Sequence, residues 1–284
     1  MTKDSFTLMT FPFDLEIYKK KMTFADILRV ANNAGLSFVD IQSIPSKKIP
    51  EHKAAMTNTG VHIYCYIATI SFFEDKDKII QNLEQEMQTA VSLGASLFMI
   101  VPYKAMIDTR KAKRMGRTET LNTMVKGFAL AVEFGKKYAL KVCVETTPQD
   151  CICLSGTEDC QYVLEQVPGL GLVFDTANML PHGDNPLEAY ERLKQYIVHV
   201  HLKDVALKKP GFALWELELD SHGNQMDCVV YGDGVIPVRE LYERMLKDGY
   251  NGKFTLEYAR PSFKVCDIDT HTKQVLKFTD YLEG

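Results

Sequence analysis

Short apolar runs alternate with longer amphipathic stretches from one end of the chain to the other. The short runs are rich in β-branched and aromatic residues and predict strands, whereas apolar residues spaced three or four apart predict helices. Strands are predicted over residues 7–11, 38–42, 61–67, 97–101, 141–145, 171–175, 198–202 and 253–257. Helices are predicted over residues 23–34, 47–59, 77–93, 118–138, 157–166, 186–195, 237–247 and 267–281. This alternation is typical of a parallel sheet with crossover helices.

Eight strands, each followed by a helix, favour a closed (β/α)₈ TIM barrel, with an open doubly wound sheet as the alternative. Gly35 and Gly94 lie just past predicted helices and suit left-handed helix ends. No linker-like composition divides the chain, so we expect a single domain over residues 1–284. The connections 102–117 and 205–236 are unusually long, and both follow strands. They are therefore expected on the C-terminal face of the barrel, as a lid or pocket wall.

The composition is that of a soluble globular protein. The 284 residues are 46% hydrophobic, and 33 Lys and Arg against 37 Asp and Glu give a formal net charge of −4. Charges of both signs are dispersed along the chain, so nucleic acid is not expected as a partner. The longest apolar runs are too short to span a membrane, and residues 1–13 lack the features of a signal peptide. The seven cysteines form no Cys-x-x-Cys pair, so we expect a reduced, cytoplasmic protein without a membrane partner.

Four of the later predicted strands end in a side chain that can bind a metal ion. These side chains are Glu145, Asp175, His201 and Glu257. The C-terminal ends of the strands converge in a parallel barrel, so the four groups would meet at one point. Three carboxylates and an imidazole suit Mn²⁺, Mg²⁺, Co²⁺ or Zn²⁺, and without a cation the carboxylates would repel one another.

Acidic residues at strand ends can instead cap the helix that follows. Glu145 precedes the sequence Thr-Thr-Pro, and Glu257 precedes Tyr-Ala-Arg-Pro, so neither residue lies directly before a predicted helix. Simple capping therefore explains neither glutamate, and the coincidence of four strand ends favours a metal site.

At these positions the chain resembles the sugar phosphate isomerase/epimerase family of the xylose isomerase-like TIM barrel superfamily. The resemblance spans nearly the whole chain, and five segments carry it: AGLSFVDI at 34–41, KVCVETTP at 141–148, FDTAN at 174–178, HLKDV at 201–205, and YGDGVIP at 231–237 leading to GKFTLE at 252–257. It implies one divalent metal ion bound by Glu145, Asp175, His201 and Glu257. It also implies that Glu145 and Glu257 act as acid/base catalysts.

Two positions depart from the family pattern. The family commonly has Glu where this chain has Asp40, and members that bind free ketoses often have His where this chain has Asn178. Sugar specificity therefore cannot be transferred from the family to this chain.

Further residues are candidates for substrate contact: Asn178, His199, Lys203, Asp204 and Arg260. His199 lies on the same side of its strand as His201, and it is either a packed core histidine or a group that steers a ligand. Lys203 and Asp204 could bind substrate hydroxyls, hold their loop or form an internal salt bridge.

Several loop residues on the same face have weaker claims. His182, Trp215 and His222 could line the pocket, although ordinary packing or exposure is the simpler interpretation. The positive residues between Lys104 and Arg117 could receive a phosphate or carboxylate, or form a solvated charge cluster.

The leading hypothesis is a metal-dependent isomerase or epimerase that acts on a ketose, keto-polyol or related sugar derivative by proton transfer through an enediolate. The alternative is a metal-dependent dehydratase of a keto-inositol-type substrate. An apurinic-site endonuclease and a non-catalytic sugar-binding barrel are also considered. The expected partner is a small-molecule sugar or sugar derivative. The resemblance also implies that the protein forms a homodimer.

Overall fold

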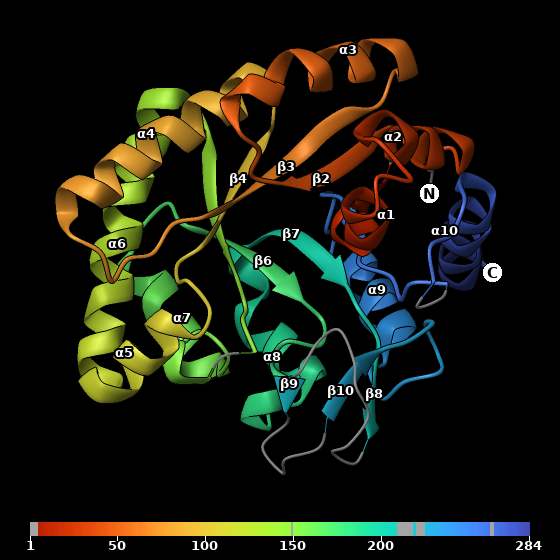
Figure 1. Cartoon of the computed structure of the whole chain (residues 1–284). Coiled ribbons are helices and arrows are strands. Elements are labelled where there is room, and N and C mark those ends of the chain that lie inside the picture. Colours follow the sequence, from red (N-terminus) through yellow and green to blue (C-terminus); the bar gives the residue numbers. More distant parts are fainter. Residues whose placement is uncertain (1–4, 149, 209–217, 220–224, 262–263) are drawn as a thin grey trace.

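The computed structural model describes residues 5–148, 150–208, 218–219, 225–261 and 264–284. Eight parallel strands close into a barrel in the order β1-β11-β7-β6-β5-β4-β3-β2 (Figure 1). Their bounds are β1 (Phe6–Met9), β2 (Phe38–Gln42), β3 (His62–Thr69), β4 (Leu97–Val101), β5 (Lys141–Glu145), β6 (Gly171–Asp175), β7 (Ile197–Leu202) and β11 (Phe254–Leu256). The predicted TIM barrel is confirmed, because β1 pairs with both β2 and β11 and so closes the ring.

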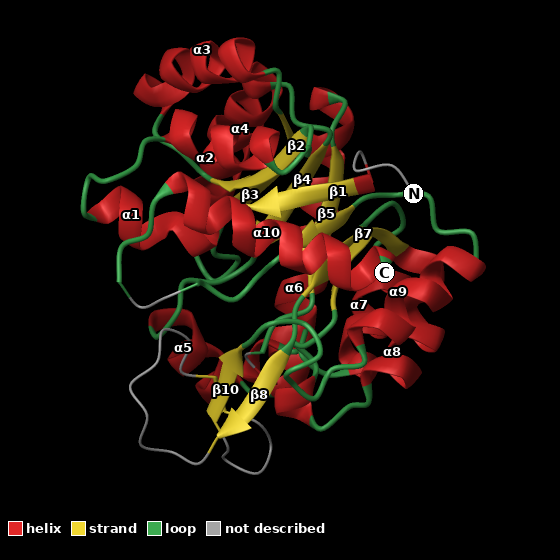
Figure 2. Ribbon diagram, turned by 90° about the vertical axis from the view of Figure 1, so that its right-hand side faces the viewer, coloured by secondary structure: helices red, strands yellow, loops and turns green. Residues whose placement is uncertain are grey.

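Helices surround the strands on the outside of the barrel (Figure 2). They are α1 (Asp14–Tyr18), α2 (Phe24–Asn33), α3 (Ile49–Thr59), α4 (Lys76–Leu93), α5 (Ile107–Met115), α6 (Arg117–Tyr138), α7 (Thr157–Gln166), α8 (Pro186–Leu193), α9 (Val238–Lys247) and α10 (Ile268–Glu283). The side chain of Thr23 caps α2 in a capping box with Asp26. Each of the eight predicted helices has a counterpart, with small differences at the ends.

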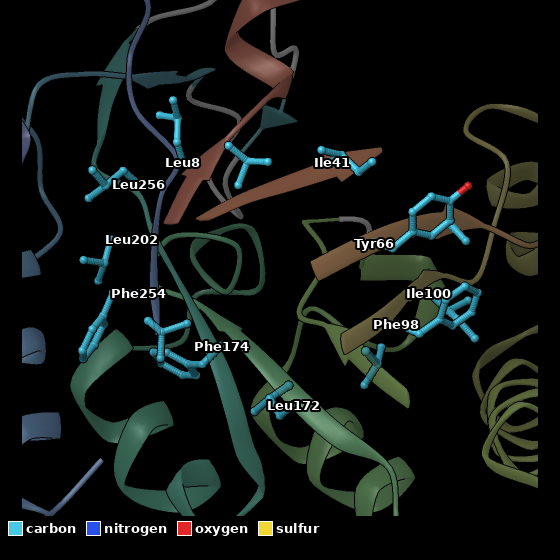
Figure 3. Close-up of a cluster of buried hydrophobic side chains, with 14 of the residues drawn as sticks. Leu8, Ile41, Tyr66, Phe98, Ile100, Leu172, Phe174, Leu202, Phe254 and Leu256 are labelled. Atoms are coloured by element: carbon cyan, nitrogen blue, oxygen red, sulfur yellow. The ribbon is translucent and has the colours of Figure 1, made fainter. Parts of the chain in front are cut away.

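Successive side chains of each barrel strand point alternately to the helices and to the barrel interior. The outward set is apolar and packs beneath the helices, and Figure 3 labels members of it such as Leu172, Phe174 and Phe254. The inward set forms a separate small apolar cluster made of Met9, Cys65, Ile67, Leu97, Met99, Cys143 and Val173. The polar side chains of the candidate site belong to this inward set.

Both long connections contain structure that the sequence did not predict. The stretch 102–117 holds α5, and the stretch 205–236 holds a three-stranded antiparallel sheet of β8 (Val205–Lys208), β10 (Gln225–Cys228) and β9 (Glu218–Leu219). Only Asp108 and Ala112 of α5 are buried, so this helix has no apolar stripe that would reveal it in the sequence.

Apolar side chains are exposed in both of these connections. Met106 and Ile107 are 68% and 69% exposed before and within α5, and Val235 is 52% exposed after β10. Such residues support the expected homodimer, which stays a prediction. Trp215 and His222 lie outside the described residues. Within the described part of the chain, no helix has the length and apolar character needed to cross a membrane.

A close contact between α6 and the loop after β3 gives a test of the packing. A Cβ atom added at Gly127 would lie 2.2 Å from Cδ2 of the buried Phe72 ring. Alanine normally stabilises a helix relative to glycine. We expect Gly127→Ala instead to lower the free energy of unfolding by about 1–3 kcal/mol, because the ring must move. Urea denaturation measures the change, with exposed Lys126→Ala as the control. A stabilised Gly127→Ala protein would contradict the packing.

Candidate metal centre

The four predicted strand-end groups meet at the C-terminal rim of the barrel. Glu145 and Asp175 are the last residues of β5 and β6, His201 lies near the end of β7, and Glu257 directly follows β11. One ligand atom from each residue lies within 4.8 Å of the ligand atoms of the other three. The barrel order places β6 and β7 between β5 and β11, so Glu145 and Glu257 flank the other two groups.

Local backbone geometry fixes the carboxylate of Asp175. Its Oδ1 accepts hydrogen bonds from the backbone N–H groups of Ala177 and Asn178, at 2.8 and 2.9 Å. Its Oδ2 is buried and accepts no hydrogen bond from any residue in the described ranges. One oxygen therefore anchors the side chain, and the other points to the cluster with a lone pair available for a cation.

The carboxylates of the cluster lie close to one another and to the imidazole of His201. Nδ1 of His201 lies 2.5 Å from Oε1 of Glu145 and 3.6 Å from Oε2 of Glu257. Burial is the main reason that the pKa of Glu257 is raised to about 8. The carboxylates of Asp175 and Glu145 raise this pKa as well, whereas Lys203 and His201 lower it. The cluster therefore carries more negative charge than its buried position tolerates unless positive charge is supplied.

A divalent cation fits this arrangement. Oδ2 of buried Asp175 accepts no hydrogen bond from a described residue and lies 3.4 Å from Nζ of Lys203; with two further carboxylates and one imidazole it forms a mixed oxygen and nitrogen donor set. Burial alone would lower the pKa of His201, but Glu145 and Asp40 raise it well above its ordinary value. The surroundings of this imidazole therefore favour positive charge, which either a proton or a metal ion can provide.

Lys203 and Asn178 lie beside the cluster. Nζ of Lys203 is 2.7 Å from Oε1 of Glu257, 3.4 Å from Oδ2 of Asp175 and 3.3 Å from Oδ1 of Asn178. The amide of Asn178 donates to the backbone oxygen of Thr146 at 2.9 Å. Both side chains therefore lie next to the four strand-end groups. Their role as substrate contacts stays a prediction.

The model of the family described as "Xylose isomerase-like TIM barrel" matches residues 28–282. The chain belongs to this family. The resemblance inferred from the five sequence segments is therefore confirmed.

The chain also resembles individual family proteins at low identity. It is 29% identical over 124 residues to an inosose dehydratase of Lacticaseibacillus casei, a stretch that covers 40% of this chain and only 38% of that relative. The structure of the probable 3-DHS dehydratase AsbF from Bacillus anthracis matches with a TM-score of 0.74 and 16% identity, over 98% of this chain and 99% of that one. The structural matches establish a shared fold.

Two further structures show the range of this barrel. The 3-keto-D-glucoside 4-epimerase YcjR from E. coli matches with a TM-score of 0.68 and 15% identity, over 97% of this chain and 99% of that one. The IOLI protein, solved with a bound zinc atom, matches with a TM-score of 0.70 and 15% identity, over 98% of each chain. The solved structures that match this xylose isomerase-like barrel thus include a probable dehydratase, an epimerase and a zinc-containing protein.

A second polar layer lies directly below the cluster, in the barrel interior. His199 is fully buried, and its Nε2 is 2.7 Å from Oδ2 of Asp40. This contact agrees with the interpretation of His199 as a hydrogen-bonded core histidine. No role for Asp40 was predicted from the sequence. Its signal there is a charged residue on the inward face of β2, among apolar interior neighbours, because a buried charge needs a partner.

Asp204 and Arg260 both form hydrogen bonds within the protein. The carboxylate of Asp204 accepts hydrogen bonds from the backbone N–H groups of Gly232, Gly234 and Ile236, so it holds the loop after β10. The guanidinium of Arg260 forms two hydrogen bonds to the carboxylate of Glu16, at 2.7 and 2.9 Å. Their prediction as substrate contacts remains without direct structural support.

Two residues of the predicted positive cluster form ion pairs with carboxylates outside the four strand-end groups. Lys104 pairs with Glu74 at 2.5 Å, and Arg117 pairs with Asp159 at 2.6 Å. His182 ends a short 3-10 helix (Leu180–His182) and lies against Gly156. None of these contacts involves the four strand-end groups.

Elemental analysis of the purified protein tests the metal centre. We expect about one divalent ion per wild-type chain, and loss of most of it in Glu145→Gln and His201→Ala, because each change removes one donor from a four-donor set. Glu86→Gln is the matched control, since Glu86 accepts from Tyr66 Oη at 2.7 Å on the outer side of the barrel. Equal metal contents in all four proteins would contradict the assignment.

Proposed function

We propose that this protein is a divalent-metal-dependent isomerase or epimerase that acts on a ketose, keto-polyol or related sugar derivative by proton transfer through an enediolate. The observation that carries the proposal is the placement of two carboxylates, Glu145 and Glu257, on opposite flanks of one cluster. A carbon bound between two such groups can lose a proton to one and regain it from the other.

A divalent cation bound by the four strand-end groups would polarise the substrate carbonyl and acidify the neighbouring C–H bond. Glu145 and Glu257 then act on the proton itself. One carboxylate accepts the proton from one face of the carbon, and the other returns a proton from the opposite face, which inverts that centre. Asn178 and Lys203 orient the hydroxyl groups from positions beside the cluster.

The family relationships support this proposal at the level of chemistry. An inosose dehydratase and a 3-keto-D-glucoside 4-epimerase are among the similar proteins, and removal of a proton next to a carbonyl is a first step open to either type of reaction. A small-molecule sugar is therefore the proposed partner, and the cytoplasmic location predicted from the sequence is compatible with it.

Hydrogen exchange with solvent tests the proton transfer. In D₂O, with Mn²⁺ or Co²⁺ supplied, we expect deuterium to appear next to the carbonyl of a substrate ketose. We expect Glu145→Gln and Glu257→Gln each to lower turnover about 10²–10⁴-fold, the usual contribution of a general acid or base. Glu86→Gln should keep wild-type turnover. Since a shielded transfer hides exchange, the decisive contrary result is full activity in either glutamine variant at the cluster.

One observation favours a second candidate, a dehydratase of a keto-inositol-type substrate. Lys203 places an ammonium group 2.7 Å from Glu257, within the same cluster. After a carboxylate removes the proton, this ammonium could protonate a neighbouring hydroxyl as its C–O bond breaks, so that the group leaves as water.

Lys203→Met separates the two candidates. If the protein is a dehydratase, formation of the ultraviolet-absorbing unsaturated ketone should fall about 10²–10⁴-fold, while deuterium exchange next to the carbonyl continues. The product mass provides a second criterion, because loss of water changes it and isomerization does not. Products of unchanged mass from the wild-type protein would exclude the dehydratase.

A further inference from the structure

The two nitrogens of His201 face different groups. Nδ1 lies 2.5 Å from Oε1 of Glu145 in the metal cluster, whereas Nε2 lies 3.5 Å from Oδ2 of Asp40 in the layer below. Both His201 and Asp40 are fully buried. The imidazole therefore connects the candidate metal centre to one carboxylate in the barrel interior.

We propose that Asp40 is a positioning residue for the metal centre, which holds His201 in the tautomer and orientation that present Nδ1 to the cation. This inference rests on the proposed metal-dependent function. A neutral imidazole can bind a metal through only one nitrogen, and the other nitrogen then carries the proton. With Nδ1 on the metal side, the proton of Nε2 faces Oδ2 of Asp40 at 3.5 Å without forming a hydrogen bond, and the negative charge of this carboxylate makes the imidazole a stronger donor.

Asp40 is itself held by several groups, as a positioning role requires. Its Oδ2 accepts from Thr255 Oγ1 at 2.6 Å and from His199 Nε2 at 2.7 Å, and its Oδ1 accepts from the backbone N–H of Cys65 at 3.2 Å. A shift in strand register between Val39 and Asp40 accompanies these contacts. Such irregularities turn a side chain to a particular direction. These contacts fix the Asp40 carboxylate independently of His201.

The same atoms raise the alternative of a second cation, bound by Asp40, His199 and His201. Hydrogen bonds already connect Asp40 to His199 and Thr255, and Thr255 bonds in turn to Thr7 at 2.8 Å. A cation here would have to displace the proton between Asp40 and His199. We therefore infer one ion per chain, with Asp40 outside its coordination sphere.

A matched control comes from another buried carboxylate beside a histidine. Glu16 is fully buried, and its Oε1 lies 3.3 Å from Nε2 of His271. Both of its oxygens accept hydrogen bonds from Arg260, and Oε1 also accepts from the backbone N–H of Cys266. Glu16, Cys266 and His271 could also hold a metal ion, but Arg260 already neutralises the Glu16 carboxylate. Replacing Glu16 therefore disturbs a buried carboxylate of a separate group without touching the four strand-end groups.

Asp40→Asn tests the inference, because it removes the negative charge that lies 3.5 Å from Nε2 of His201 while nearly keeping the size of the side chain. Titration calorimetry with Mn²⁺ and with Co²⁺ should show about 10–100-fold weaker binding than in the wild type, with one ion per chain in both proteins. The visible absorption of bound Co²⁺ should also change, since the imidazole is no longer oriented. Glu16→Gln should keep the wild-type affinity and the wild-type Co²⁺ spectrum.

Thermal unfolding of the metal-free proteins separates loss of fold from loss of affinity. If Asp40→Asn does not fold, Thr255→Val replaces it, because this change keeps the charge of Asp40 and removes one donor that holds it. Its affinity should fall toward the lower end of the ~10–100-fold range. Unchanged affinity and an unchanged Co²⁺ spectrum in a folded variant, or two ions per wild-type chain, would overturn the positioning role. A wild-type protein that binds no ion would instead remove the proposed function.

Discussion

Alternation of side chains along closed parallel strands is the constraint on which this structure depends. In each strand, alternate residues face the helices, and the residues between them face the narrow interior of the barrel, which is just wide enough for side chains. The outward set, exemplified by Phe174 and Leu256, is apolar and fastens the helices to the barrel. The inward set carries Glu145, Asp175 and His201, which therefore cannot separate from one another without opening the barrel.

Crowding of these groups follows from topology. Parallel strands bring all their C-terminal ends to one rim, so donors far apart in the chain become neighbours. Glu145 and Glu257 are separated by more than a hundred residues, yet one histidine nitrogen contacts both. The repulsion among the carboxylates is the physical reason why we propose that this site binds a cation.

The strands and most helices could be predicted because their apolar periods are strong. The residues of β2, β4, β5 and β6 agree with the predicted strands at both ends. The helix α5 and the small antiparallel sheet were missed, because neither has a clear apolar period over a sufficient length. The meeting of the four proposed donors could be predicted from their place at strand ends, since a parallel barrel brings these ends together; that they bind a metal ion stays a prediction.

Asp40 shows what sequence reasoning could not reach. Its contacts with His199 and Thr255 join β2 to β7 and β11, which lie on the other side of β1 in the closed barrel. A strand period places a residue inside the barrel but does not tell which groups from distant strands it will meet. The same limit applies to Asp204, whose partners lie in the loop after β10, and to Arg260, whose partner Glu16 lies in the short helix α1.

The pairing of β1 with β11 has a consequence for the order of events during synthesis. Phe6 lies opposite Phe254 in the barrel, so β1 cannot pair with β11 until most of the chain has left the ribosome. Until then β1 has one open edge, and contacts of such high sequence separation form slowly. Glu257 emerges with this last strand. A nascent chain can therefore gather only three of the four donors, and tight capture of a metal ion would mark the end of folding.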